Sequence, residues 1–282
     1  MKILVIVVTY NGMQWLEKCL GSVVASKAPA DLFVVDNAST DGSADYVSLL
    51  FPKAVLVRNA SNLGFAEGNN IGLRYALEKG YDYVYLLNQD AWLEPDTLGE
   101  LVKISEAHPG FGILSPVQTQ ADGKVNPIFR RDVVARAKAT GQDGIFEAPF
   151  MMAAHWFLTA ECLRKVGLFA DIFPIYGNDD NYCHRVLYHG FKIGYVKDLA
   201  VVHDKQYGHQ SKDYRLYRNF YMSALVALCN IRKPLWRQWL HVFALTLVKT
   251  LKFFSFKPWG YLWKMLTADK TSVKRLREES SK

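Results

Sequence analysis

Cysteine is scarce in this chain of 282 residues, which contains only four, and all four lie far apart. No C-x-x-C pair occurs, so the common zinc-binding patterns and the disulfide framework of small secreted domains are both excluded. A reducing, cytoplasmic location is therefore expected. The first apolar stretch is not followed by G-x-G-x-x-G, which argues against a nicotinamide dinucleotide site.

Long apolar runs are missing as well. The first one, residues 3–8, is only six residues long and stops at Thr9-Tyr10-Asn11-Gly12, which favours a β-strand over a secretory signal. Between residues 235 and 256 the longest stretch without an ionisable side chain is Val242–Val248. A membrane-spanning helix needs about 20 predominantly apolar residues, so no span is expected there.

Positive charge is concentrated at the C-terminal end. Residues 205–282 contain 16 Lys and Arg against 4 Asp and Glu, whereas the net charge of the whole chain is +7. Helices are expected over 214–231, 235–255 and 259–267, where Trp, Phe and Leu are interleaved with the basic residues. This composition favours helices that lie on an anionic membrane surface, and nucleic acid is not expected as a partner. The alternative is that these helices pack on the rest of the protein.

Strand-like and helix-like segments alternate in the first third of the chain. Apolar strands at 3–8, 31–35, 54–58 and 83–87 are separated by helical stretches at 14–25, 43–50 and 67–79. This alternation predicts an α/β fold in which helices cover both faces of a mostly parallel sheet. The pattern loosens over 118–148, which predicts a loosely ordered excursion, and 192–202 contains two short strand-like runs.

Polar side chains follow these strands where each one ends, at the edge of the sheet where ligands bind in open α/β folds. Asp36 can accept hydrogen bonds from a base N–H or from ribose hydroxyls, although it can also serve as a turn residue. Gly64 lets the backbone approach a ligand closely. Asp90 is placed to bind a Mg²⁺ or Mn²⁺ ion that bridges a diphosphate. The alternative role of helix cap suits Asp96 better.

Four motifs occur in order along the chain: T-Y-N-G at 9–12, V-D-N-A-S-T-D-G at 35–42, N-L-G-F-A-E-G-N-N-I-G at 62–72 and L-L-N-Q-D at 86–90. Together they resemble the family 2 glycosyltransferases of the GT-A fold, in particular the rhamnosyltransferase-like branch, over residues 3 to about 210. The resemblance implies inverting transfer from a nucleoside-diphosphate sugar, with Mg²⁺ or Mn²⁺ on a D-x-D-like motif. Here that motif is Asn88-Gln89-Asp90. Its first carboxylate is replaced by an amide, which leaves Asp90 as the main metal ligand.

The same resemblance implies roles for further residues. The stretch 178–185, N-D-D-N-Y-C-H-R, is similar to the family pattern E-D-x-D-L-x-x-R. It places Asp179 at the catalytic base, with Asp180 as the alternative. His203 is expected to complete the metal site or to contact the diphosphate, with His209 as a nearby competitor. The residues expected to bind the donor are Thr9, Tyr10, Asn11, Asp36, Arg58, Asn62, Gly64, Asn70, Asn88 and Gln89.

The resulting hypothesis is an inverting glycosyltransferase that moves a sugar from dTDP-rhamnose or a UDP-sugar to a saccharide or lipid-linked saccharide in cell-surface polysaccharide synthesis. A catalytic domain is expected over 1–204, with a nucleotide-sugar part up to about 115 and an acceptor part after it. A basic amphipathic helical region follows over 205–282, and the protein is expected to be peripheral on the cytoplasmic face of the membrane.

Two alternatives remain. A sugar nucleotidyltransferase would need a Gly-rich loop bearing Arg or Lys after the first strand, and residues 9–14 lack it. A non-catalytic scaffold subunit that binds a nucleotide sugar is suggested by the amides that replace acids at Asn88, Asn178 and Asn181.

Overall fold

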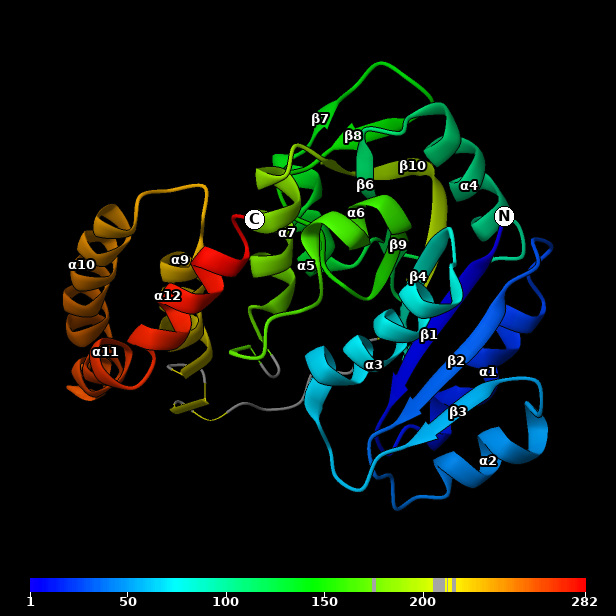
Figure 1. The fold of residues 1–282 in the computed structure, drawn as a ribbon, viewed down its shortest axis with the longest axis horizontal. Coiled ribbons are helices and arrows are strands. Elements are labelled where there is room, and N and C mark those ends of the chain that lie inside the picture. The colour runs from blue at the N-terminus through cyan, green and yellow to red at the C-terminus, as the bar shows by residue number, and fades with distance from the viewer. Residues whose placement is uncertain (174–175, 205–210, 212, 215–216) are drawn as a thin grey trace.

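A ten-stranded sheet forms the centre of the computed structural model, which describes residues 1–173, 176–204, 211, 213–214 and 217–282 (Figure 1). Its strands are β1 (Ile3–Thr9), β2 (Asp31–Asp36), β3 (Val55–Arg58), β4 (Tyr83–Asn88), β5 (Ala91–Trp92), β6 (Phe111–Thr119), β7 (Lys138–Ala139), β8 (Ile145–Glu147), β9 (His155–Thr159) and β10 (Lys192–His203). Their order is β3-β2-β1-β4-β9-β6-β10-β8-β7, and β5 pairs with β10.

The sheet consists of two parallel blocks joined by one antiparallel strand. Strands β3, β2, β1 and β4 pair in parallel, and so do β6 and β10. Strand β9 lies antiparallel between β4 and β6, and β8 and β7 extend the edge beyond β10 in antiparallel pairing. The expected α/β fold is confirmed, with more antiparallel pairing than the sequence indicated.

Helices cover both faces of the sheet because side chains alternate along each strand. They are α1 (Met13–Val24), α2 (Ser43–Leu50), α3 (Gly64–Lys79), α4 (Thr97–Ala107), α5 (Pro127–Asp132), α6 (Ala160–Val166) and α7 (Asn178–Tyr188), with a 3₁₀ turn η1 (Val134–Arg136). In β1, Leu4 belongs to the same buried cluster as Leu73 of α3. Its neighbour Val5 points the other way and shares a cluster with Leu16 of α1. Helices α3, α6 and α7 therefore cover one face, and α1, α2 and α4 cover the other.

The C-terminal segment forms a helical unit beside α7 (Figure 1). It contains a π-helical turn η2 (Tyr217–Met222), α9 (Ser223–Cys229), α10 (Leu235–Phe253), α11 (Lys257–Thr267) and α12 (Lys270–Glu279). Phe173, Phe220, Val242 and Met265 are members of its own buried cluster. None of the helices in the described part of the chain combines the length and the hydrophobicity that a membrane span requires.

Some local predictions differ from the structure. The two strand-like runs at 192–202 are one strand, β10, whose register shifts between Val196 and Ala200. The excursion at 118–148 contains α5, η1, β7 and β8, and α12 had no sequence prediction. Asp96 stands at the N-cap position of α4 but makes no capping hydrogen bond, because its carboxylate pairs with Lys27 at 2.9 Å instead.

Candidate active site

Gln89 connects the carboxyl ends of β1 and β4. Its Oε1 atom accepts hydrogen bonds from the Thr9 hydroxyl and from the Tyr10 backbone N–H, both at 2.8 Å. Gly12 lies so close that a Cβ there would come within 2.4 Å of the same oxygen. The amide of Gln89 therefore fixes the turn after β1, and a side chain at position 12 would displace it.

The turns after β1 and β2 are also interlocked. Asn11 has a left-handed backbone (φ 48°), and its side-chain oxygen accepts a hydrogen bond from the Thr40 N–H at 2.9 Å. Asp36 is buried, and its Oδ2 accepts from the Ser39 N–H at 3.1 Å. Its other oxygen, Oδ1, is buried with no hydrogen-bond partner among the described residues. A buried acceptor of this kind is costly unless a ligand donates to it.

Two residues near these turns that were predicted to bind the donor make hydrogen bonds within the protein. The guanidinium of Arg58 binds α2, with Asp45 Oδ1 at 2.8 Å and Ser48 Oγ at 2.9 Å. Asn62 accepts a hydrogen bond at 2.8 Å from the N–H of Gly64, whose φ is 77°. Both residues lie where the sequence placed them, next to the strand ends, with their polar atoms engaged locally.

Asn70 forms hydrogen bonds to a loop that is distant in the sequence. It is buried in α3, and its side-chain amide binds both backbone groups of Phe169, accepting from the N–H at 2.9 Å and donating to the carbonyl at 3.0 Å. Arg185 of α7 holds the same loop by donating to the carbonyls of Val166 and Leu168 at 2.8 and 2.7 Å. The loop before α7 is thus fixed from two sides.

His203 and Asp90 lie together at the next strand end. Strand β5 pairs antiparallel with β10 and sets Ala91 opposite His203. This pairing brings His203 Nε2 to 3.5 Å from Asp90 Oδ1, and His203 is buried. The described residues contain no cluster of three or more His, Cys, Asp or Glu side chains that could hold a metal ion. Any cation bound here would need further oxygen atoms from a ligand.

A second buried histidine, His155, is hydrogen-bonded to the same end of β10. The ring of His155 is hydrogen-bonded to the Val202 carbonyl at 3.0 Å through Nε2 and to the Tyr85 hydroxyl at 2.9 Å through Nδ1. Burial lowers the pKa of His155 to about 3, so the ring is neutral at pH 7. A carbonyl can only accept, so Nε2 carries the proton and Nδ1 accepts from Tyr85.

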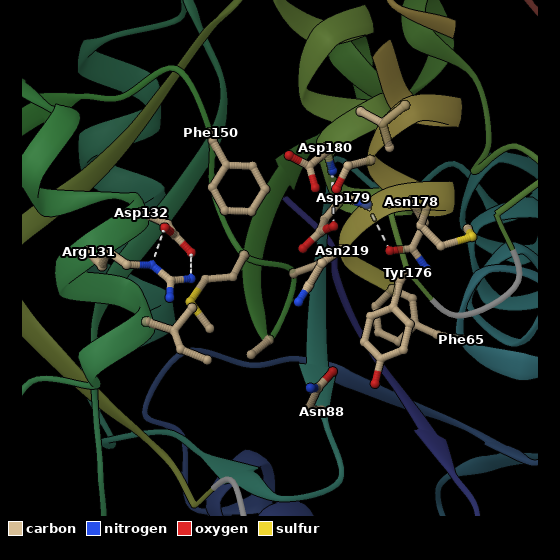
Figure 2. A pocket seen from close by; sticks show the side chains of 18 of the residues that line it. Phe65, Asn88, Arg131, Asp132, Phe150, Tyr176, Asn178, Asp179, Asp180 and Asn219 are labelled. Atoms are coloured by element: carbon tan, nitrogen blue, oxygen red, sulfur yellow. Dashed lines mark hydrogen bonds and ion pairs between the residues drawn. The ribbon is translucent and has the colours of Figure 1, made fainter. Parts of the chain in front are cut away.

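A cleft of about 640 Å³ opens beside these residues, between the sheet, α7 and the C-terminal helices. Figure 2 shows Asn88 at one side of it and Asp179 and Asp180 at the other, with Asn219 pointing into the space between them. The lining residues from different elements include Phe65, Asn88, Arg131, Asp132, Phe150, Tyr176, Asp179, Asp180, His203, Asn219, Met222, Ser223 and Val226. The cleft therefore brings the predicted base and one predicted metal ligand to one cavity, whereas Thr9, Tyr10 and Asp36 lie outside its lining.

Asp179 and Asp180 lie in the first turn of α7, which begins at Asn178 after Gly177, whose φ of 85° lets the chain turn into the helix. Asp179 accepts a hydrogen bond from the Asp180 N–H at 3.0 Å. Partial desolvation at the edge of the cleft, followed by the negative charges of Asp179 and Asp132, raises the pKa of Asp180 to about 7, although the residue is exposed. The pKa of Asp180 is thus higher than that of an ordinary surface carboxyl group.

Several cleft residues had no sequence prediction. Arg131 and Asp132 form a bidentate ion pair at 2.6–2.7 Å on α5, and Phe150 and Tyr176 face the same space (Figure 2). Aromatic residues outside the periodic strand and helix patterns were the available signal, because such rings often stack on ligands. His209, the competitor of His203, lies outside the described residues.

Comparison with known proteins bears on this site. A family model described as glycosyl transferase family 2 matches residues 4–156. An N-acetylglucosaminyl-diphospho-decaprenol L-rhamnosyltransferase of Mycobacterium tuberculosis is 28% identical over 136 residues, which are 45% of this chain and 44% of that protein. The dTDP-rhamnosyl transferase RfbF of Shigella flexneri is 23% identical over 204 residues, which are 70% of this chain and 67% of that protein. The chain thus aligns with less than half of the mycobacterial relative.

Solved structures show the same fold. TarS of S. aureus in complex with UDP superimposes with a TM-score of 0.62 at 17% identity, covering 86% of this chain and 70% of that one. The mannosyltransferase of Pyrobaculum calidifontis in complex with GDP-Man and Mn²⁺ gives a TM-score of 0.60 at 19% identity, covering 99% of this chain and 86% of that one. The predicted GT-A fold is confirmed by these neighbours.

Proposed function

The chain belongs to glycosyl transferase family 2, and from this membership we propose that it transfers a sugar from a nucleoside-diphosphate sugar to a saccharide acceptor, with inversion at the anomeric carbon. The observation that carries the proposal is the cleft, whose lining combines Asp179 with Asn88 and His203. Inverting transfer needs a carboxylate on the acceptor side and a diphosphate site on the opposite side.

The donor site lies at the carboxyl ends of β1, β2 and β4. The unpartnered buried Oδ1 of Asp36 suits the ring N–H of uracil or thymine. The Gln89 contacts with Thr9 and Tyr10 order the adjoining turn, so the backbone is in place before a nucleotide binds. UDP occupies the structural neighbour TarS, and RfbF is named for dTDP-rhamnose. The proposed donor is therefore dTDP-rhamnose or a UDP-sugar.

A divalent cation, Mg²⁺ or Mn²⁺, is proposed at Asp90 and His203. A carboxylate oxygen and an imidazole nitrogen 3.5 Å apart suit Mn²⁺, and the donor diphosphate would supply the other oxygens. Structural neighbours were solved with Mn²⁺. When bound, such an ion neutralises charge on the departing diphosphate.

Asp179 is the proposed base. It accepts the proton of the acceptor hydroxyl while that oxygen bonds to the anomeric carbon, and the bond from that carbon to the diphosphate breaks with its electron pair leaving on the diphosphate. Asn70 and Arg185 fix the loop before α7 and so contribute to holding Asp179 in place. Asp180 is the alternative base, and its raised pKa gives it a proton near neutral pH.

The acceptor is proposed to be a saccharide or a lipid-linked saccharide of cell-surface polysaccharide synthesis, as the name of the mycobacterial relative suggests. The proposed location is the cytoplasmic face of an anionic membrane. An exposed apolar stripe on α10 supports this location, and it comprises Trp236, Leu240, Phe243, Leu247 and Leu251, which are 41–73% exposed. Lys249 and Lys252 on the same helix would complement the negative lipid surface.

A panel of UDP-, dTDP- and GDP-sugars tests the proposed function. Release of UDP or dTDP should require Mg²⁺ or Mn²⁺, and NMR of the product formed with an oligosaccharide acceptor should show the inverted anomer. Pyrophosphate release from a nucleoside triphosphate and a sugar phosphate would indicate a nucleotidyltransferase instead. Nucleotide-sugar binding without hydrolysis or transfer would indicate a scaffold subunit, and either result contradicts the proposal.

A further inference from the structure

A second cavity of about 570 Å³ lies between α7, α9 and the start of α10. The lining residues are His184, Ser223, Val226, Ala227, Asn230, Arg232, Lys233, Pro234, Arg237, Gln238 and His241. Three of them are permanent cations, two are histidines and none is an acid. A concave site lined by cations of this density favours an anionic ligand.

The three cations have no carboxylate counter-ion in the part of the chain that the structure describes. Among the described residues no carboxylate pairs with Arg232, Lys233 or Arg237, whereas other basic residues of this region have partners, such as Arg275 with Asp171 at 3.0 Å and Lys257 with Asp213 at 2.5 Å. Burial, followed by the positive charges of Arg232 and Lys233, lowers the pKa of His184 to about 4. The pocket therefore has an uncompensated positive field.

The turn that bears Arg232 and Lys233 is held in a fixed conformation. The guanidinium of Arg277 on α12 donates to the carbonyls of Leu228, Asn230 and Lys233 at 2.9, 2.6 and 2.7 Å. The side chain of Asn230 accepts from the Arg232 N–H at 3.0 Å. A preorganised turn costs less entropy on binding than a flexible one.

The basic pocket adjoins the active-site cleft on one side and the apolar stripe on the other. Ser223 and Val226 of α9 line both cavities. At the other end Arg237 and His241 belong to α10, on which Trp236 and Leu240 are 60% and 62% exposed. A single ligand could thus present a sugar, a charged group and a hydrocarbon chain to three neighbouring surfaces in that order.

We propose that the pocket around Arg232, Lys233 and Arg237 binds the diphosphate of a lipid-linked acceptor, with its saccharide in the cleft and its hydrocarbon along α10. This inference rests on the proposed sugar transfer and names the acceptor class for it. Arginine suits the task because its planar guanidinium binds phosphate oxygens in pairs.

Geranyl diphosphate, pyrophosphate and geraniol are suitable probes, measured by calorimetry with UDP, dTDP and Mn²⁺ present in excess to fill the donor site. We expect geranyl diphosphate to bind more tightly than pyrophosphate, and geraniol to bind weakly or not at all. The triple variant Arg232→Gln, Lys233→Gln, Arg237→Gln should weaken geranyl diphosphate binding by at least about tenfold. The triple variant Lys270→Gln, Lys274→Gln, Lys282→Gln removes the same charge from the end of the chain and should bind as the unaltered protein does.

An equal loss of geranyl diphosphate affinity in both triple variants would show that only the net charge matters, and it would overturn the proposed site. Equal affinity for pyrophosphate and geranyl diphosphate would identify a free-phosphate site and overturn the lipid-linked ligand. Thermal melting of each variant checks that the fold is retained. If no nucleotide sugar is turned over but geranyl diphosphate binding still depends on the three cations, the transfer function fails and the site stands. If transfer to a soluble saccharide proceeds but the cations are irrelevant to geranyl diphosphate, the site fails alone.

Discussion

His203 Nε2 lies 3.5 Å from Asp90 Oδ1, and the two-residue strand β5 is the reason. The antiparallel pairing of β5 with β10 is reinforced by the hydrogen bond from the Asp204 N–H to the Asp90 carbonyl at 2.8 Å. The approach of the two side chains therefore depends on backbone pairing, and it should persist when no ligand is bound.

Replacement of Asp90 by Asn should abolish the dependence of UDP or dTDP binding on Mn²⁺. The substitution keeps the size of the side chain and removes the charge that a hard cation requires. Calorimetric titration with and without Mn²⁺ measures the effect. Asp96→Asn is the matched control, because Asp96 is an exposed acid that pairs with Lys27. Mn²⁺-dependent binding that survives in Asp90→Asn would refute the metal assignment.

Replacement of Asp179 by Asn should lower the rate of transfer by roughly 10²–10⁴, the usual contribution of a general base. Donor affinity should change little, because Asp179 lies across the cleft from Asn88. Turnover and donor binding are measured on the same preparations. If Asp180→Asn shows the large loss and Asp179→Asn does not, the base is Asp180.

Replacement of Asp180 by Asn should stabilise the protein at pH 8 and have little effect at pH 4. The pKa of this carboxyl is raised in the folded state, so its protonated form is favoured there and stability is lost as the pH rises through about 7. An amide carries no charge at any pH and escapes this loss. Melting temperatures from pH 4 to 8 test the slope, with Asp171→Asn, an exposed acid in the loop before α7, as the control. A stabilisation equal at both pH values would contradict the raised pKa.

Replacement of Asn70 by Leu should destabilise the fold by about 1–3 kcal/mol for each backbone group of Phe169 that is left unpaired. Urea unfolding measures the free energy. Asn62→Ala removes one exposed hydrogen bond and should cost less. Turnover should also fall in Asn70→Leu at temperatures where the variant remains folded, because the loop precedes Asp179. Unchanged stability would show that the two hydrogen bonds between Asn70 and Phe169 do not contribute to the free energy of unfolding.

Replacement of Leu240, Leu247 and Leu251 by Ser should weaken sedimentation with anionic liposomes. These side chains are 54–73% exposed on one side of α10, so the change removes apolar surface without opening the core. Binding of the unaltered protein should also fall as salt rises, since exposed charges are screened beyond about 8 Å at physiological ionic strength. Leu49→Ser and Leu50→Ser on α2 are controls of similar exposure. Equal sedimentation of both sets would indicate that α10 does not touch the membrane.

The sequence predicted the parts of this molecule that depend on local pattern. The early strands and helices were placed within a few residues because period-two and helical spacing reflect burial on a sheet face or a helix face. The position of Asp36 and Asp90 at strand ends followed from the same pattern. Side-chain direction did not: Arg58 binds α2 and Asn70 binds Phe169, and neither contact is encoded near those residues in the chain.

Long-range pairing limited the prediction of the site. The approach of His203 to Asp90 requires the β5–β10 pairing, and two residues are too short for a strand to be recognised by periodicity. The wall formed by Asn219, Met222 and Val226 depends on how the C-terminal helices dock beside α7, which amphipathic spacing does not specify. The strand-end chemistry was therefore predictable, and the opposite wall of the cleft was not.

The family match ends at residue 156, whereas Asp179, Asp180 and the helical wall of the cleft come later in the chain. The described lining of the cleft thus combines residues of the matched segment, such as Asn88, with residues that follow it, such as Asp179 and His203. A recombination point near the start of α6 would exchange Asp179 together with His203, the proposed metal ligand. A foreign segment grafted there would change the acceptor side and keep the proposed metal site only if it carried a histidine at the position of His203.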